Sequence, residues 1–343
     1  MRDMSMNAAE QVRALVDRRY RSTTPYDVSR KKIREFARAV QDYHPAHWSA
    51  DAAADLGFPG LVAPATFSSI ILHRVQREIL DTVLTGYRSS RILHADQVLD
   101  LGRPVVAGDR LTCDIYFESF RHFADYDVLS IKSVLVDQHG ETVQTGSTAL
   151  LARTGPADPR LAETVRDIAV RGYSPAGPGQ LTVADADRVA PPCDSRIPFT
   201  TVDFGALTVG TELPSRTVRL ARGDLENYAA VVGDLDPVGC TDATASGLPS
   251  AVAPGMLKLG MAATFLSSWL GDPAAVTRFR AQFAHYTHYL RIPPFATSAI
   301  EFTGRVTSID PRRRRATLAI DARSDGRRLF GYAAAEVRFP LGD

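Results

Sequence analysis

Alternating hydrophobic and polar residues predict two groups of β-strands in this chain. Segments of the first group alternate with a period of two, which is typical of half-buried strands, over residues 91–100, 109–118, 126–136 and 142–151. A second group shows the same alternation over residues 299–306, 315–322 and 329–339. A long apolar segment, which predicts a buried helix, precedes each group. The pattern therefore predicts two units, each with one central helix and an antiparallel meander.

An internal repeat relates the two units. In each copy a short amphipathic helix is expected to end at an aspartate, Asp42 or Asp234, that begins a D-x-x-P turn. A Gly-x-Pro loop then leads through Val-Ala-Pro into the apolar helix, with the proline at Pro64 or Pro254. The offset between the copies is 192 residues at the aspartates and 190 at the prolines. Because the order of these landmarks is kept, we infer a duplicated domain.

The repeat divides the chain into two domains and a connection. The N-terminal domain covers residues 1–153, a linker rich in Pro, Gly and Asp covers 154–199, and the C-terminal domain covers 200–343. One helical segment is expected in the linker, near residues 161–170. Because each domain wraps one sheet around one helix, the two sheets can pair side by side. The prediction is an α+β fold that forms a pseudo-dimer within one chain.

Composition and charge exclude several classes of protein. Hydrophobic residues make up 45% and charged residues 23%, and 40 Lys+Arg against 39 Asp+Glu give a net charge of +1. No global field would attract nucleic acid or an anionic membrane, and the basic run at residues 312–315 is interpreted as a solvated hairpin tip. Cys113, Cys193 and Cys240 lie far apart, which disfavours a disulfide scaffold and a cysteine zinc site. We expect a cytoplasmic protein without a secretory signal or a membrane-spanning segment.

The motifs of the two copies resemble the MaoC-like hydratase and dehydratase family, whose pattern D-x-N-P-x-H is followed by G-x-P and A-H-G-M-L. Residues 26–41 and 96–111 are similar to the first subunit of the actinobacterial heterodimeric (3R)-hydroxyacyl-ACP dehydratase. The second copy is similar to the partner subunit of that enzyme. This resemblance, which spans residues 18–153 and 200–340, implies that both subunits are fused into a double hot dog.

The resemblance also assigns the candidate catalytic residues. Asp42 and His47 of the first copy keep the motif's aspartate and histidine, with His44 where asparagine is usual. In the second copy Asp234 keeps the aspartate, but Gly239 replaces the histidine. The second-type subunit of the family normally holds both residues. The resemblance therefore implies an intact pair in the copy that is non-catalytic by family habit, and a degenerate site in the other copy.

Dehydration of a 3-hydroxyacyl thioester requires a base, an acid and hydrogen-bond donors for the developing enolate oxygen. Asp42 and His47, five residues apart across a proline turn, can place a carboxylate and an imidazole on one side of an acyl chain, and histidine exchanges protons near neutral pH. Alignment to A-H-G assigns the donor amide at the start of the apolar helix to Ala65 in the first copy and to Gly255 in the second. The structural alternative is that Asp42 caps a helix turn and His47 packs beside Trp48.

We expect a hydratase/dehydratase that interconverts (3R)-3-hydroxyacyl and trans-2-enoyl thioesters, carried on ACP or CoA, in fatty-acid or polyketide metabolism. No metal or other cofactor is implied, and a further homodimer is optional. Two alternatives stay open: a tailoring enzyme that performs cyclisation or isomerisation in the same tunnel, and a non-catalytic acyl-carrier-binding partner. Cys240 is interpreted as a small buried residue, although a nucleophilic thiol is the alternative. His285 and His288 are discounted as metal ligands because residues three apart on a strand face opposite sides.

Overall fold

The computed structural model describes most of both predicted domains. The described residues are 13, 16, 18–22, 24–82, 92–123, 126–153, 191–192, 194–233, 242–243, 249–283, 290–293 and 295–341. In this part of the chain, no helix combines the length and the hydropathy that crossing a bilayer requires.

The first half contains three helices, one 3₁₀ turn and six strands among its described residues. In chain order these are β1 (Arg19–Arg21), β2 (Tyr26–Asp27), α2 (Arg30–Ala39), η1 (Pro45–His47), α3 (Ala50–Asp55), α4 (Ser69–Thr82), β3 (Ile92–Leu101), β4 (Arg110–Phe123), β5 (Tyr126–Val136) and β6 (Thr142–Arg153). The strand positions agree with the predicted alternation, and the chain turns between β5 and β6 at Gly140, whose φ of 83° favours glycine.

The second half repeats this order. Its described elements are η3 (Phe204–Ala206), β7 (Glu212–Leu220), α6 (Arg222–Val232), β8 (Asp242–Ala243), β9 (Pro249–Val252), α7 (Gly255–Leu270), β10 (Val276–Phe283), β11 (Arg291–Ile292), β12 (Ser298–Asp310), β13 (Arg315–Ser324), β14 (Arg327–Arg328) and β15 (Phe330–Arg338). The strands predicted over 299–306, 315–322 and 329–339 correspond to β12, β13 and β15. The predicted hairpin tip joins β12 to β13, and there the Arg314 guanidinium lies 4.8 Å from the Phe204 ring centroid.

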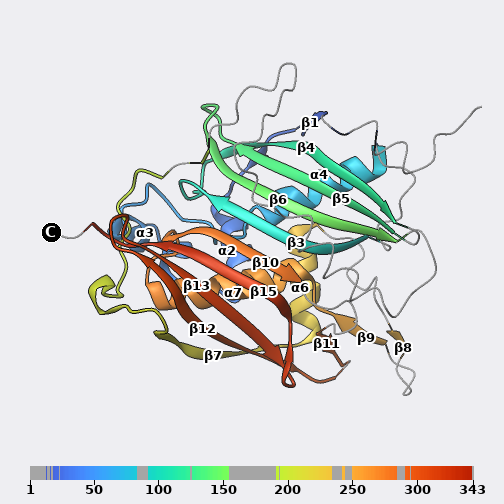
Figure 1. The fold of residues 1–343 in the computed structure, drawn as a ribbon. Helices are drawn as coiled ribbons and strands as arrows, with labels where there is room; N and C mark the ends of the chain where they lie inside the picture. Colours follow the sequence, from blue (N-terminus) through green and yellow to red (C-terminus); the bar gives the residue numbers. More distant parts are fainter. Residues whose placement is uncertain are drawn as a thin grey trace, which may run out of the picture.

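The two halves share one antiparallel sheet. Its order among the described strands is β1-β4-β5-β6-β3-β10-β15-β13-β12-β7, and β3 of the first half pairs directly with β10 of the second. In this central pairing Val98 lies opposite Arg280, with the neighbouring residues in continuous register. Figure 1 shows β3 and β10 side by side at the middle of the molecule. This arrangement confirms the predicted α+β double hot dog with two sheets joined edge to edge.

A central helix lies against each half of the sheet (Figure 1). Twelve of the residues of α7 are buried, and they lie on all sides of the helix. A helix that is apolar all round is stable only when it is enclosed, and here the sheet and the first half enclose it. Most of the buried hydrophobic side chains, from both halves, form one continuous core. The pseudo-dimer is therefore a single packed body, and α7 contacts both halves.

Some details differ from the sequence-based expectations. The first amphipathic helix, α2, ends at Ala39 and not at Asp42, because the chain leaves the helix through a left-handed residue, Gln41, at φ 55°. The edge strand β7 and the central strand β10 were not predicted. The domain boundaries remain a prediction, because residues 154–190, with the helical segment expected near 161–170, lie outside the described residues.

Candidate active site

The end of helix α2 places Asp42. The amide of Gln41 donates to the Arg38 carbonyl at 3.1 Å, and the amide of Asp42 donates to the Ala37 carbonyl at 2.8 Å. With Gln41 in the left-handed region, these two bonds form a Schellman motif, which reverses the chain at a helix end. Glycine usually occupies the left-handed position, and the second half has Gly233 there, at φ 81°. The motif fixes the backbone of Asp42 directly after the turn.

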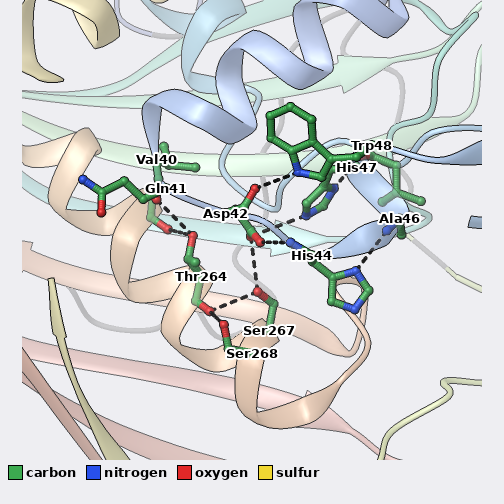
Figure 2. Close-up of polar contacts among 12 residues, drawn as sticks. Val40, Gln41, Asp42, His44, Ala46, His47, Trp48, Thr264, Ser267 and Ser268 are labelled. Carbon is green, nitrogen blue, oxygen red and sulfur yellow. Dashed lines mark hydrogen bonds and ion pairs between the residues drawn. The ribbon is translucent and has the colours of Figure 1, made fainter. Parts of the chain in front are cut away.

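A short 3₁₀ turn then brings His47 back towards Asp42. Pro45 begins this turn, η1, and the fixed φ of proline suits the first position of a helix. His47 Nε2 lies 3.4 Å from Asp42 Oδ2, and the exposed fractions of the two side chains are 0% and 4%. Figure 2 shows the imidazole and the carboxylate facing each other, with the Trp48 indole beside them. The geometry thus brings together the two residues that the motif predicts as a pair.

The second ring nitrogen of His47 determines which nitrogen carries the proton. Nδ1 lies 2.6 Å from the backbone oxygen of Val62. A carbonyl oxygen only accepts hydrogen bonds, so Nδ1 must hold a proton and donate it. In the neutral ring Nε2 is therefore unprotonated, and no described residue hydrogen-bonds to it. Nε2 is available as a base and faces the carboxylate that would stabilise the protonated ring.

The Asp42 carboxylate is held by donors from both halves of the chain. The amide of His44 donates to Oδ1 at 3.1 Å, and the hydroxyl of Ser267 donates to Oδ2 at 3.2 Å. Burial raises the pKa of Asp42, but the neighbouring His47 ring and the His44 amide together outweigh it, so the net pKa lies below the ordinary value. Asp42 is consequently a carboxylate at neutral pH.

One face of α7 forms the support for this loop. Its contacts to residues 40–44 come from three positions three or four residues apart, which share a helix face, and from the residue that caps the helix: Gly260, Thr264, Ser267 and the cap Gly271. The Thr264 hydroxyl donates to the Val40 carbonyl at 3.3 Å, and His44 Nε2 donates to the Gly271 carbonyl at 3.0 Å. A Cβ at Gly260 would lie only 2.6 Å from Val40 Cγ1. The absence of a side chain at Gly260 allows the close approach.

Ala65, the predicted donor for the enolate oxygen, lies in a turn and not in a helix. The chain makes turns over residues 65–68, where the Phe67 amide donates to the Pro64 carbonyl at 2.9 Å, and α4 begins at Ser69. A cavity of about 30 Å³ lies beside Ala65, and its lining residues come from both halves, with Pro273 and Ala274 from the second. Asp42 and His47 are not among the residues that line this cavity. The role of the Ala65 amide stays a prediction.

The second predicted site is described only at Gly255. This residue is the first of α7, after Pro254, as expected. Asp234, Gly239 and Cys240 lie outside the described residues, as do His285 and His288, so the predictions made for them stay predictions. Of the cysteines, Cys113 is described: it is buried, and burial raises the pKa of its thiol to about 12.

Sequence reasoning did not identify Ser267 as part of the site. It lies 225 residues from Asp42 along the chain. No local motif contains both residues, and the spacing of small residues along α7 was the only sequence signal available. The assignment of Asp42 and His47 as catalytic stays a prediction, beside the alternative that His47 packs next to Trp48. The Trp48 indole donates to the Asp42 carbonyl at 3.2 Å and stacks on Tyr43 with ring centroids 6.1 Å apart, which leaves the imidazole facing the carboxylate.

Comparisons with known proteins identify the family. A family model described as "FAS1-like, dehydratase domain region" matches residues 14–146. A UPF0336 protein of Streptomyces coelicolor is 43% identical over 140 residues, which are 41% of this chain and 93% of that protein. A UPF0336 protein of Mycobacterium tuberculosis is 36% identical over 141 residues, which are 41% of this chain and 89% of that protein. These relatives correspond in length to one half of the chain.

A solved structure extends the similarity to both halves. A "MaoC-like dehydratase" is 37% identical, covers 96% of this chain and 99% of its own, and superposes with a TM-score of 0.80. The chain belongs to the MaoC-like dehydratase family. A conserved hypothetical protein of M. tuberculosis, whose structure is described as a double hotdog fold, matches 97% of this MaoC-like chain and 99% of its own with a TM-score of 0.61. That protein is 15% identical, so it supports the fold alone. Membership supports a hydro-lyase activity at the level of the family.

Proposed function

We propose that this MaoC-like protein interconverts (3R)-3-hydroxyacyl and trans-2-enoyl thioesters, carried on ACP or CoA, at the Asp42–His47 pair. The observation that carries the proposal is the 3.4 Å approach of His47 Nε2 to an ionised, hydrogen-bonded Asp42 carboxylate. The tautomer set by Val62 leaves Nε2 unprotonated in the neutral ring. The pair thus combines an unprotonated ring nitrogen with a fixed negative charge that would stabilise the protonated ring.

In the dehydration direction, Nε2 removes a proton from C2 of the thioester. The electron pair of that C–H bond forms the C2=C3 double bond, and the hydroxyl leaves C3. The imidazolium donates its proton to the departing hydroxyl, so that water is released and the neutral ring is restored. Asp42 stays ionised throughout and stabilises the imidazolium, as a carboxylate does for a catalytic histidine in other enzymes. In the hydration direction the same ring deprotonates a water molecule that attacks C3.

The amide of Ala65 is the proposed donor to the thioester oxygen. His47 is tied to the Val62 carbonyl, three residues before Ala65, so the loop that orients the imidazole continues into the turn that presents this amide. Because a backbone N–H is already oriented before the reaction, it stabilises the developing enolate without reorganisation. The side chains of Asp42 and His47 are buried, and excluding water strengthens these electrostatic interactions.

Hydration of enoyl thioesters tests the proposal directly. Purified protein is supplied with crotonyl-CoA, longer enoyl-CoA and the matching enoyl-ACP, and loss of the enoyl thioester absorbance is followed. We expect turnover with at least one substrate, and at least a hundredfold lower kcat in Asp42→Asn and His47→Gln, the usual scale for losing an acid–base group. His139→Gln is the matched control, because His139 is exposed in the β5–β6 turn. Its kcat is expected to equal that of the wild type.

Two outcomes would contradict the proposal. Equal rates in the His47→Gln and His139→Gln variants would show that the pair does not act in catalysis. An absence of turnover of all enoyl thioesters, combined with retained binding of a saturated acyl thioester, would instead favour the non-catalytic acyl-carrier-binding alternative. Thermal unfolding of each variant separates loss of catalysis from loss of fold.

A further inference from the structure

A lysine is buried near the beginning of α7, the most apolar of the helices that the structure describes. Lys258 lies in the first turns of α7, and the exposed fraction of this residue is 6%. The sequence is rich in arginine and contains just four lysines, at positions 31, 32, 132 and 258. Lys31 is exposed and lies near Glu35, as does Lys32. Burial of an ammonium group is costly unless a counter-charge is present, so the position of Lys258 calls for a partner.

The side chains around Lys258 come from both halves. Its Nζ lies 5.9 Å from the ring centroid of Phe283, on β10. The Phe283 ring in turn lies 4.8 Å from the ring of His94, on β3. Phe283 also packs on the first residue of α7, since a Cβ at Gly255 would be 3.1 Å from Phe283 Cε1. The amino end of α7, an aromatic ring, an imidazole and an ammonium therefore converge at one place.

The positive charge in this cluster comes from Lys258, because burial lowers the pKa of His94 to about 4 and leaves its ring neutral at neutral pH. No ion pair with Lys258 occurs in the described part of the chain, and burial lowers its pKa to about 8. His94 Nε2 is buried, and no described group hydrogen-bonds to it. The carboxylate of Asp96, two residues from His94, is paired with Arg280 at 3.0 Å.

The helix adds donors at the same place. The amides of the first turn of α7 have no preceding helical carbonyl to bond, and the helix dipole is positive at this end. The Cα–Cβ bond of a helical residue tilts towards the amino end, so the Lys258 side chain starts in the direction of these amides. An anion bound here would meet an ammonium group and free N–H groups together.

We propose that Lys258, with His94 and Phe283 at the amino end of α7, binds the carboxylate group of a ligand that has an apolar chain. One ammonium balances one negative charge, and charge-assisted hydrogen bonds compensate for its removal from water. A phosphate dianion would leave an uncompensated charge in apolar surroundings. The Phe283 ring offers apolar surface to the chain of the ligand. This site is independent of the proposed hydratase activity, because Ser267, which holds Asp42, lies nine residues further along α7, about 14 Å away at 1.5 Å per residue.

The small number of lysines makes a direct test possible. Protein labelled with ¹³C in lysine gives one Cε signal for each lysine, and Lys258→Met identifies the signal of Lys258 by its loss. Sodium hexanoate is then titrated into the wild-type protein. We expect a saturable shift of the Lys258 signal and a rise in its pKa of at least one unit above about 8, because a bound carboxylate favours the ammonium form. The signals of the other three lysines are expected to stay unchanged.

Calorimetric titration with hexanoate supplies the second measurement. We expect at least tenfold weaker binding in Lys258→Met, and wild-type binding in Leu259→Met, which changes the neighbouring buried residue of the same helix without changing its charge. Hexanol and inorganic phosphate serve as probes of the chain and of the charge alone, and both are expected to bind more weakly than hexanoate.

Three results would overturn the proposal. The first is a Lys258 signal that does not respond to hexanoate in the wild-type protein. This measurement remains possible if Lys258→Met does not fold, because a lysine that titrates near pH 8 can be recognised among the four lysine signals. The second is equal hexanoate binding by the wild type and Lys258→Met. The third is phosphate binding as tight as that of hexanoate, which would show a general anion site. None of these measurements depends on enoyl hydration.

Discussion

Replacing Lys258 with methionine should make the protein more stable at neutral pH. The substitution keeps a long, unbranched side chain of similar volume and removes a buried positive charge that no described carboxylate neutralises. A residue that lowers the stability of the folded protein is expected where that residue serves binding. The prediction therefore also bears on the proposed carboxylate site at Lys258.

The magnitude follows from the pKa of Lys258. Burial lowers it from 10.5 to about 8, and at 1.36 kcal/mol for each pH unit this corresponds to about 3 kcal/mol of lost stability. Between pH 8 and 10.5 the unfolded chain binds more protons at this residue than the folded chain, so the stability of the wild type rises with pH in that window. Below pH 8 the full cost is present. The advantage of Lys258→Met should therefore be about 3 kcal/mol at pH 7 and roughly half of that at pH 9.5.

Urea unfolding at several pH values, in buffers without carboxylates, measures this difference. Fluorescence and circular dichroism should give coincident transitions, and the midpoint of the variant should exceed that of the wild type most strongly at pH 7. Adding hexanoate should stabilise the wild type and not the variant, since a ligand stabilises the state that binds it. Equal midpoints at pH 7, or a difference that does not shrink as pH rises, would refute the reasoning.

Three further predictions concern the support of the site and its titration. Ser267→Ala should lower kcat for enoyl hydration about tenfold, the equivalent of one hydrogen bond to a charged group. It should also move the acid limb of the kcat/KM profile to higher pH, because Asp42 loses a donor to its ionised form. Ser267→Thr should largely restore both properties, and a pH profile that does not move in Ser267→Ala would argue against a positioning role. Gly260→Ala should destabilise the protein by about 1–3 kcal/mol, because the new Cβ would clash with Val40. In the control Gly223→Ala, in α6, the new Cβ meets nothing within 4 Å, and no destabilisation is expected. Similar unfolding midpoints for the two variants would contradict the close approach of α7 to Val40. Burial lowers the pKa of His94 from 6.5 to about 4. As pH drops from 6.5 to 4, the unfolded chain binds the proton before the folded chain does, so the free energy of unfolding should fall by about 3 kcal/mol. A His94→Gln variant whose unfolding midpoint depends on pH in the same way as that of the wild type would contradict this.

Local patterns in the sequence predicted the strands and the candidate pair. Period-two alternation identified β3 to β6 and the C-terminal meander, because the faces of a strand depend on successive residues. The resemblance of the motif at Asp42 and His47 to the family pattern indicated the candidate pair, and the proline turn between the two residues brings their side chains close together. The repeat likewise indicated two similar units that join through their sheets.

The tertiary structure decided which distant residues meet. Ser267 donates to Asp42 across 225 residues, and Lys258, Phe283 and His94 converge from α7, β10 and β3. Neither meeting follows from a local pattern, because each depends on how closely α7 packs against the first half and on which strands pair at the centre of the sheet. The packing of α7 and the pairing of the central strands depend on the hydrophobic core as a whole, whose main cluster extends through both halves. The sequence by itself therefore determined the two units and indicated the candidate pair. Only the packing of one unit on the other determined how that pair is supported, and where a buried lysine lies without a counter-charge among the described residues.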